Sequence, residues 1–209
     1  MSDSRIVNIL VLVSGSGTNL KALIEAEAEG EFINGKIAAV LSDRSGIYAL
    51  ERAKKAGIPV FTEIPDQNLP RPERFQKLSE GILRLCREKQ IGLIVLAGFL
   101  SILRGDIIEE YSGRMINLHP ALLPKYGGRG MYGERVHRAV LAAGETESGC
   151  TVHLVDSGTD TGPALLQRKV PVLPGDTAES LAERIHKEEH VAIVLAVKMM
   201  LERLDTEER

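Results

Sequence analysis

The sequence contains no tryptophan, and its four phenylalanines and four tyrosines are few for 209 residues. Proteins that bind single-stranded nucleic acid stack bases on aromatic side chains, and protein interfaces are also enriched in aromatic residues. Basic residues are not in excess, because 26 Lys and Arg stand against 29 Asp and Glu and give a net charge of −3. The composition therefore predicts small-molecule partners and no nucleic acid, since general nucleic-acid binding needs a basic surface.

Cysteines and long apolar segments are scarce as well. Cys86 and Cys150 lie far apart and lack the close spacing of zinc or redox motifs, so the chain fits a reducing compartment better than a disulfide-rich secreted domain. The apolar run from Ile6 to Val13 is too short to cross a bilayer. We therefore expect a cytoplasmic protein with no membrane partner.

Short apolar runs alternate with amphipathic segments along the chain. Strands are expected at residues 6–13, 36–41, 59–62, 92–97, 115–119, 149–156 and 165–172, and helices at 18–29, 48–56, 74–89 and 177–204. We expect the last two strands to pair antiparallel, and Asp176 or Thr177 to cap the long C-terminal helix. The alternation predicts an α/β fold with a doubly wound, mostly parallel sheet in a single domain over residues 1–209.

A glycine-rich segment, Ser14-Gly-Ser-Gly-Thr-Asn19, follows the first predicted strand and precedes the first helix. Backbone N–H groups and the helix dipole can hold a phosphate at such a position. A dinucleotide fingerprint would need a third glycine where Leu20 stands, and a P-loop would need a Gly-Lys-Ser/Thr sequence that is missing. We therefore expect a phosphate site, with a simple tight turn as the alternative. Asp43, after the second strand, is interpreted as a solvated helix-capping residue.

Two polar side chains are expected to converge at the end of the strand at 115–119. Asn117 and His119 are two residues apart, so they share one face of that strand. Pro120 ends the strand directly after His119, which places the imidazole at a carboxyl edge, where open α/β sheets bind ligands. An amide and an imidazole side by side can donate hydrogen bonds to a developing oxyanion, and this favours acyl transfer.

The segment 156–163 is rich in turn-forming residues and holds two aspartates, which Asx-turns alone could explain. An oxyanion-stabilising histidine has to be protonated, and a nearby carboxylate favours the protonated form. Asp160 is the candidate for that carboxylate. His153, on the preceding strand, is a weaker candidate that either supports the site from behind or is purely structural.

Other chemistries are less well supported by the residues. Cys86 falls within a predicted helix and no Gly-x-Ser-x-Gly segment occurs, so a nucleophilic triad is not favoured. His137, His186 and His190 carry no His-Glu-x-x-His pattern, and we expect no metal. His186 and His190 do stand four apart on one helical face, a geometry that binds metal in some proteins and arises by chance in more.

Four segments occur together in an order that resembles one enzyme family: Ser14-Gly-Ser-Gly-Thr-Asn19, Leu96-Ala-Gly-Phe99, Asn117-Leu-His-Pro-Ala-Leu-Leu-Pro124 and Asp160-Thr-Gly-Pro163. Nearly the whole chain is similar to the phosphoribosylglycinamide formyltransferases, the folate-dependent transformylases of purine synthesis. The resemblance implies transfer of a formyl group from 10-formyltetrahydrofolate to the amine of glycinamide ribonucleotide, without a metal. It also implies a Rossmann-type nucleotide-binding half at about 1–100, a folate-binding catalytic half at about 101–209, and a monomer or homodimer.

The same resemblance implies roles for individual residues. Asn117 and a protonated His119 would stabilise the tetrahedral intermediate, and Asp160 would sustain the charge on His119. The nucleotide would be held by Gly17, Thr18, Asn19, His186, Lys187, Glu188 and Glu189. The folate would contact Leu100, Ser101, Ile102, Leu103 and Asn117, together with the loop residues Asp156, Ser157, Gly158, Thr159 and Asp160.

Some positions depart from the family pattern. Ser101 stands where members of the family often carry arginine, so a contact to the folate is expected to be lost there. The segment Lys125–Glu134 is glycine-rich and longer than the corresponding loop, and it is either a mobile lid over the cleft or a flexible surface loop. The family's arginine before the third helix matches either Arg71 or Arg74.

Three alternatives to this function remain open at the sequence level. Methionyl-tRNA formyltransferase normally adds a C-terminal RNA-binding domain, whereas only one helix is expected here after residue 177. Formyltetrahydrofolate hydrolase normally carries a regulatory domain before its first strand, which here is expected to begin at Ile6. A nucleotide-binding regulatory module would keep the phosphate loop without needing Asn117, His119 and Asp160 together.

Overall fold

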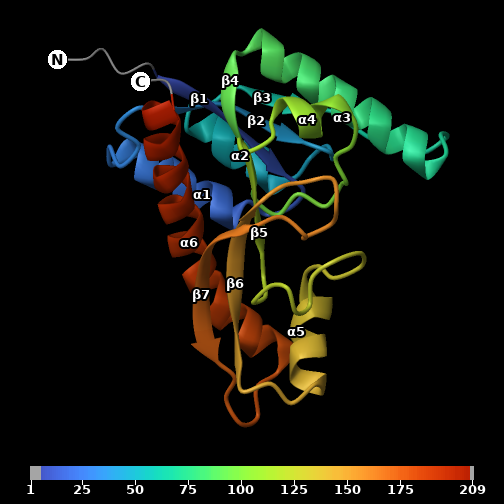
Figure 1. The fold of residues 1–209 in the computed structure, drawn as a ribbon, viewed down its shortest axis with the longest axis vertical. Coiled ribbons are helices and arrows are strands. Elements are labelled where there is room, and N and C mark those ends of the chain that lie inside the picture. The colour runs from blue at the N-terminus through green and yellow to red at the C-terminus, as the bar shows by residue number, and fades with distance from the viewer. Residues whose placement is uncertain (1–5, 208–209) are drawn as a thin grey trace.

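A seven-stranded sheet forms the centre of the protein in the computed structural model, which describes residues 6–207 (Figure 1). The strands are β1 (Val7–Val13), β2 (Gly35–Ser42), β3 (Val60–Thr62), β4 (Ile91–Leu96), β5 (Met115–His119), β6 (Glu147–Leu154) and β7 (Ala164–Pro171). Their order in the sheet is β3-β2-β1-β4-β5-β6-β7. Strands β1 to β5 pair in parallel, and β6 pairs antiparallel with both β5 and β7. The predicted mostly parallel sheet with an antiparallel pair is confirmed.

Six helices connect or follow these strands within the described residues: α1 (Thr18–Ala28), α2 (Tyr48–Lys55), α3 (Arg71–Glu88), α4 (Asp106–Glu110), α5 (Glu134–Ala142) and α6 (Ala178–Glu207). The sequence pattern predicts four of them within three residues at each end. It misses α4, which has five residues, and α5, which has nine, because such short helices hold too few buried positions to show a period. Residues 1–5 and 208–209 of the expected domain lie outside the described residues.

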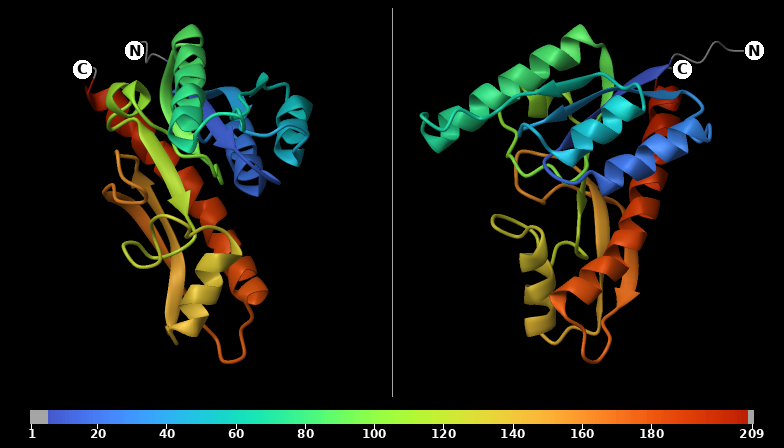
Figure 2. Two further views of the ribbon diagram at one scale, coloured as in Figure 1. Left: turned by 90° about the vertical axis from the view of Figure 1, so that its right-hand side faces the viewer. Right: turned by 180° about the vertical axis from the view of Figure 1, so that it is seen from behind.

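Helix α6 runs along the length of the molecule, from α5 at one end to α1 at the other (Figures 1 and 2). Thr177 caps its start, because the Thr177 hydroxyl accepts a hydrogen bond from the Ser180 backbone N–H at 3.2 Å, and the Ser180 hydroxyl accepts one from the Thr177 N–H at 3.0 Å. The other predicted cap, Asp176, pairs instead with Arg184 at 2.7 Å. No helix among residues 6–207 is both long and apolar enough to cross a membrane.

The central strand β1 is buried on both faces, which is why its sequence is a nearly continuous apolar run. Ile9 and Val11 point into a core cluster that they share with α1, α2 and α6. Leu10 and Leu12 point to the opposite side and pack with α3 and α4. The first of these clusters contains residues from both expected halves of the chain, so one core joins the two halves.

The strand order fixes where a ligand can enter. The connection from β1 leads to β2 on one side, whereas β4 lies on the other side of β1. The loops that leave the carboxyl ends of β1 and β4 therefore diverge, and a crevice opens between them, as in other doubly wound sheets.

Candidate active site

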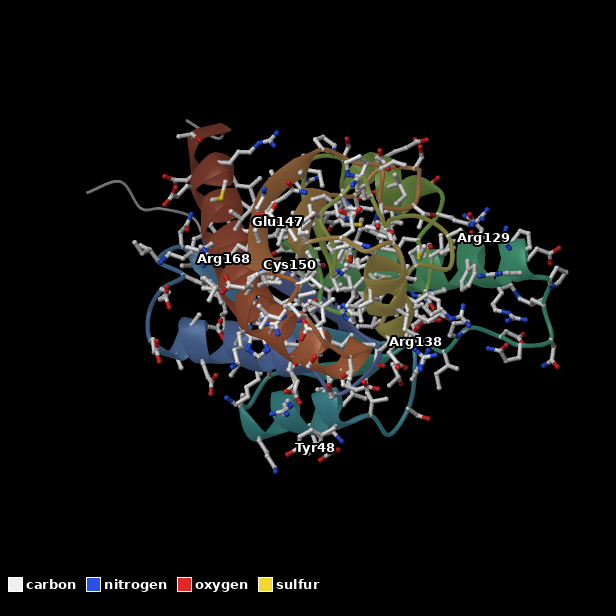
Figure 3. All side chains as sticks on the ribbon, turned by 90° about the horizontal axis from the view of Figure 1, so that it is seen from below. Tyr48, Arg129, Arg138, Glu147, Cys150 and Arg168 are labelled. Atoms are coloured by element: carbon white, nitrogen blue, oxygen red, sulfur yellow. The ribbon has the colours of Figure 1, made fainter. Side chains whose placement is uncertain are left out.

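A cleft of about 570 Å³ lies at the carboxyl ends of β1, β4 and β5. Most residues expected at the site line it: Gly17, Thr18, Asn19, Leu100, Ser101, Ile102, Leu103, Asn117, His119, Asp156, Gly158, Thr159, Asp160, His186 and Glu189. Ser157, Lys187 and Glu188 lie outside the lining. Lys187 is exposed on α6, and Glu188 binds Arg168 of β7, which lies beside α6 in Figure 3.

The first wall of the cleft is the glycine loop that joins β1 to α1. Gly17 has a φ of 72°, in the left-handed region, and a Cβ there would lie 2.6 Å from the Ala49 Cβ, so only glycine fits. The carbonyls of this loop are turned towards α2, because the Gly15 oxygen accepts from the Ala49 N–H and the Ser16 oxygen accepts from Arg52 Nε at 3.0 Å. The first amides of α1 remain free of helical partners. With no acidic residue in its first turn, this helix end suits an anion.

The opposite wall carries Asn117, His119 and Asp160, which the structure brings together from β5 and the loop after β6. Nδ1 of His119 lies 3.5 Å from Asp160 Oδ2, and Asn117 Nδ2 lies 3.4 Å from Asp160 Oδ1. His119 is only 3% exposed. Its Nε2 lies 2.8 Å from the Tyr126 carbonyl oxygen. Because a carbonyl oxygen can only accept, Nε2 carries a proton, and Nδ1 is the nitrogen that faces the carboxylate.

His153 orients the amide of Asn117, and a carbonyl contact again shows which ring nitrogen carries a proton. Nδ1 of His153 lies 2.8 Å from the Leu154 carbonyl oxygen, so this nitrogen is protonated. In the neutral ring Nε2 is then an acceptor, and it receives a hydrogen bond from Asn117 Nδ2 at 3.1 Å. The NH₂ group of Asn117 is therefore turned towards His153 and Asp160. Of the two interpretations left open for His153, support of the site from behind agrees with this geometry.

The carboxylate of Asp160 is held in its ionised form. Burial by itself raises the pKa of Asp160, but the charge of His119 and the hydrogen bond from the Gly128 N–H help to lower the pKa below its usual value. The Gly128 hydrogen bond is 2.9 Å long. Backbone atoms of the glycine-rich segment thus hold both His119 and Asp160. Whether the segment opens as a lid stays a prediction.

The third side of the cleft is formed by α6. Glu189 is 4% exposed, and its Oε2 accepts hydrogen bonds from His186 Nδ1 at 2.7 Å and from Asn19 Nδ2 at 3.3 Å. The hydrogen bond from His186 and the charge of Glu189 outweigh burial and raise the pKa of His186. A buried carboxylate therefore links α6 to the glycine loop, and it can accept a hydrogen bond from a ligand amine.

The segment after β4 forms the side expected to contact folate, and it is tied to strands β1 and β2. The Leu100 N–H donates to the Ser14 hydroxyl at 2.8 Å, and the Ser101 hydroxyl donates to Asp43 Oδ2 at 2.7 Å. The interpretation of Asp43 as a solvated helix cap is wrong, because Asp43 is 5% exposed and Ile47 precedes α2. A serine at position 101 is short enough to bond this buried carboxylate directly.

The structure also decides between the two candidate arginines. Arg71, at the start of α3, lines the cleft, and its guanidinium lies 5.6 Å from the centre of the Phe75 ring. Arg74 turns away and binds the carbonyl oxygens of Gln67 and Leu69 at 3.1 Å. Arg71 is therefore the arginine available to a ligand.

His137 lines the cleft although the sequence pattern assigns it no role there, whereas Met131 and Tyr132 of the lining belong to the glycine-rich segment that was one candidate for a lid. His137 lies on α5, and Val136 and Val140 on the same helix are buried in the core. In the sequence, His137 stands between Val136 and Val140. Because no helix was predicted there, this pattern does not show which way the histidine side chain faces.

Neither cysteine is suited to act as a nucleophile. Burial raises the pKa of both Cys86 and Cys150 to about 12, so neither thiol is a nucleophile at neutral pH. Among residues 6–207 no group of three or more His, Cys, Asp or Glu side chains is placed to hold a metal ion.

Comparison with known proteins agrees with this geometry. Residues 7–197 match the model of the formyl transferase family, and the chain belongs to that family. Within it, the chain falls with the phosphoribosylglycinamide formyltransferases, as its motifs predict. The Escherichia coli K12 enzyme of that name is 38% identical over 191 residues, which are 91% of this chain and 85% of that protein.

A solved structure shows the same fold. Glycinamide ribonucleotide transformylase 1 from Symbiobacterium toebii has a TM-score of 0.85 and 38% identity, over 94% of this chain and 88% of that chain. The trifunctional purine biosynthetic protein adenosine-3 of Drosophila melanogaster is 40% identical over 202 residues. Those residues are 96% of this chain but only 14% of that protein, so the chain matches one part of a much longer polypeptide.

Proposed function

We propose that this protein transfers the formyl group of 10-formyltetrahydrofolate to the amine of glycinamide ribonucleotide. The products are formylglycinamide ribonucleotide and tetrahydrofolate, a step of de novo purine biosynthesis. One observation carries the proposal: the cleft that holds Asn117, His119 and Asp160 also contains the free amides at the start of α1. A formyl-transfer site and a phosphate site thus face the same space in a member of the formyl transferase family.

The two substrates are proposed to bind on different walls. The nucleotide phosphate binds at Gly17, Thr18 and Asn19, and its amine extends towards Glu189. The folate ring lies between the segment 100–103 and the loop 156–160, and backbone groups of these segments recognise the ring. Arg71 at the cleft mouth offers a positive charge to the folate's carboxylate tail.

The reaction needs a tetrahedral intermediate to be stabilised and one proton to be moved. The amine nitrogen attacks the formyl carbon, and the formyl oxygen gains negative charge. Asn117 and the Nδ1–H of His119 donate to this oxyanion, since each lies farther from Asp160 than a normal hydrogen bond, at 3.4 Å for Asn117 Nδ2 and 3.5 Å for His119 Nδ1. Asp160 keeps His119 charged and, through water, passes the proton from the new ammonium to N10 of the folate as the old C–N bond breaks.

The remaining features of the proposal concern partners and location. Both ligands are small molecules, and the mechanism uses 10-formyltetrahydrofolate as co-substrate and requires no metal. We propose a cytoplasmic enzyme that acts as a monomer or a homodimer.

The test measures consumption of 10-formyltetrahydrofolate with and without glycinamide ribonucleotide, for the native protein and for His119→Ala. We expect nucleotide-dependent turnover that falls about 100-fold or more in the variant, the scale for losing one oxyanion donor. Equal consumption without the nucleotide would assign the protein as a hydrolase instead. Phosphate-ligand binding that survives in a protein without any turnover would support a regulatory module.

A further inference from the structure

One buried histidine of the cleft takes no part in the proposed mechanism. His137, on α5, is 3% exposed and lines the cleft, yet its Nδ1 has no hydrogen-bond partner among the described residues. Buried polar atoms are paired in most proteins, and an unpaired one destabilises the free protein. Because its neighbours Val136 and Val140 are fixed in the core, the ring cannot move far to find a partner within the protein.

The surroundings of His137 place it on the nucleotide side. The charged and titratable groups that act on it are Glu134 of its own helix, His119 of β5, and Glu189 and His186 of α6. None of them belongs to the segments 100–103 or 156–160. Burial lowers the pKa of His137, so the imidazole is neutral at pH 7 and can accept a hydrogen bond as well as donate one.

A second unpaired atom lies on the same side. Oδ1 of Asn19 is buried and has no hydrogen-bond partner within residues 6–207, while Nδ2 of the same side chain donates to Glu189. Polar groups from α1, α5 and α6 thus line the path between the phosphate site and His119, and two of them have an atom without a hydrogen-bond partner in the described part of the chain.

We infer that His137 forms a hydrogen bond with the acceptor nucleotide, at the end that carries the amine, between Glu189 and His119. This inference rests on the proposed function. It adds to that function a direct contact from α5, and this contact aims the amine at the formyl carbon beside Asn117 and His119.

The test compares three substitutions that differ in which polar atom they keep. His137→Leu keeps the volume and removes both nitrogens, His137→Asn keeps a polar atom near the position of Nδ1, and His137→Gln keeps one near Nε2. Glycinamide ribonucleotide is titrated calorimetrically into each protein, the KM for 10-formyltetrahydrofolate is measured, and thermal unfolding is followed.

We expect His137→Leu to raise the nucleotide Kd about fivefold to tenfold, the scale of one hydrogen bond, with the folate KM within about twofold. At least one of the amide variants should bind the nucleotide within about twofold of the native protein, and it identifies the nitrogen that makes the contact. His190→Leu is the matched control, because His190 also has a buried, unpaired nitrogen but does not line the cleft. Its nucleotide Kd should not change.

Several results would overturn the inference. One is a nucleotide Kd that is unchanged in His137→Leu or raised equally in all three variants. Another is an equal rise of the nucleotide Kd and the folate KM together with a lower Tm. A third is the same rise of the nucleotide Kd in His190→Leu. If the native protein neither binds nor uses the nucleotide, the proposed function fails and the inference fails with it. If the native protein turns over both substrates and the His137 variants have an unchanged nucleotide Kd, the role of His137 is rejected and the proposed function stands.

Discussion

The two main walls of the cleft are built from different parts of the chain. The glycine loop is a continuous segment whose backbone amides face the cleft, and its shape depends on one residue, Gly17. The opposite wall is a network of side chains in which Asn117, His153 and Asp160 meet across 36 and 43 residues of sequence. Local chain geometry therefore makes the first wall, and long-range packing makes the second, so the walls should respond differently to substitution.

The largest effect is expected from removing charge in the network. Asp160→Asn keeps the shape of the side chain but removes the negative charge that faces His119 Nδ1 and carries the proton, so kcat should fall about 100-fold while the nucleotide KM stays within about threefold. Steady-state kinetics with each substrate varied would check this. Asp176→Asn is the control, because Asp176 pairs with Arg184 outside the cleft and its loss should lower Tm without changing kcat. If the nucleotide KM instead rises by the same factor as kcat falls, the two walls do not have separate roles in catalysis and nucleotide binding.

The glycine loop is tested by Gly17→Ala. The new Cβ meets Ala49 and forces the loop to move, so the nucleotide KM should rise about tenfold or more with a smaller change in kcat. Gly30→Ala is a matched control, because Gly30 also has positive φ but has open space around it and lies outside the cleft. Gly30→Ala should cost roughly 1–2 kcal/mol of stability from backbone strain and leave the nucleotide KM unchanged. Equal KM changes in the two variants would remove the special role of the loop.

A pH-dependent stability difference should mark the network but not the loop. The folded pKa of Asp160 is lowered, so its stabilising contribution is complete above the ordinary aspartate value near 4 and is lost as pH falls through the folded pKa. Urea unfolding should show a stability gap between the native protein and Asp160→Asn at pH 6 that narrows at pH 3. The stability difference between the native protein and Gly17→Ala should not narrow in this way between pH 6 and pH 3. If the difference in free energy of unfolding between the native protein and Asp160→Asn widens at pH 3, the folded pKa of Asp160 is raised and not lowered.

The smallest effect is expected where the folate segment is tied to β2. Ser101→Ala removes the hydrogen bond to Asp43 and leaves that carboxylate buried without its donor. The KM for 10-formyltetrahydrofolate should rise about threefold, with the nucleotide KM unchanged, in the same two-substrate assay. Ser101→Thr keeps the hydroxyl and should restore the native value. An unchanged folate KM in the alanine variant would mean that this tie does not position the segment.

The sequence could predict features whose signals are local. The apolar run of β1, the glycines at the start of α1 and the two-residue spacing of Asn117 and His119 each reflect a period or a turn that needs no distant partner. The alternation of strands and helices predicted the doubly wound, mostly parallel class of the sheet, and the order of the strands came from the structure. These signals predicted the glycine loop, Asn117 and His119 at the carboxyl ends of their strands, and most other predicted residues of the cleft lining came from the family resemblance.

The remaining features depend on contacts that no local pattern records. The local pattern predicts a solvated helix cap at Asp43, but Asp43 is buried and bonded to Ser101, which is 58 residues away. His137 faces the cleft because α5 packs against α6, and the nine residues of α5 show too few buried positions to reveal a helix. Arg71 and Arg74 are three residues apart, and no local pattern records that Gln67 and Leu69 bind Arg74 while Arg71 lines the cleft.

The position of α6 has a consequence for how the chain folds as it is made. Core residues from Leu181 to Leu201 complete the cluster that contains Ile9, Val11 and Leu20. Synthesis at roughly 5–20 residues per second separates β4 from the end of that stretch by roughly 5–20 s. During this interval the early strands have helices α1 and α2 beside them but lack the apolar cover that α6 provides. The nascent first half therefore keeps part of its core open to chaperones until α6 has emerged.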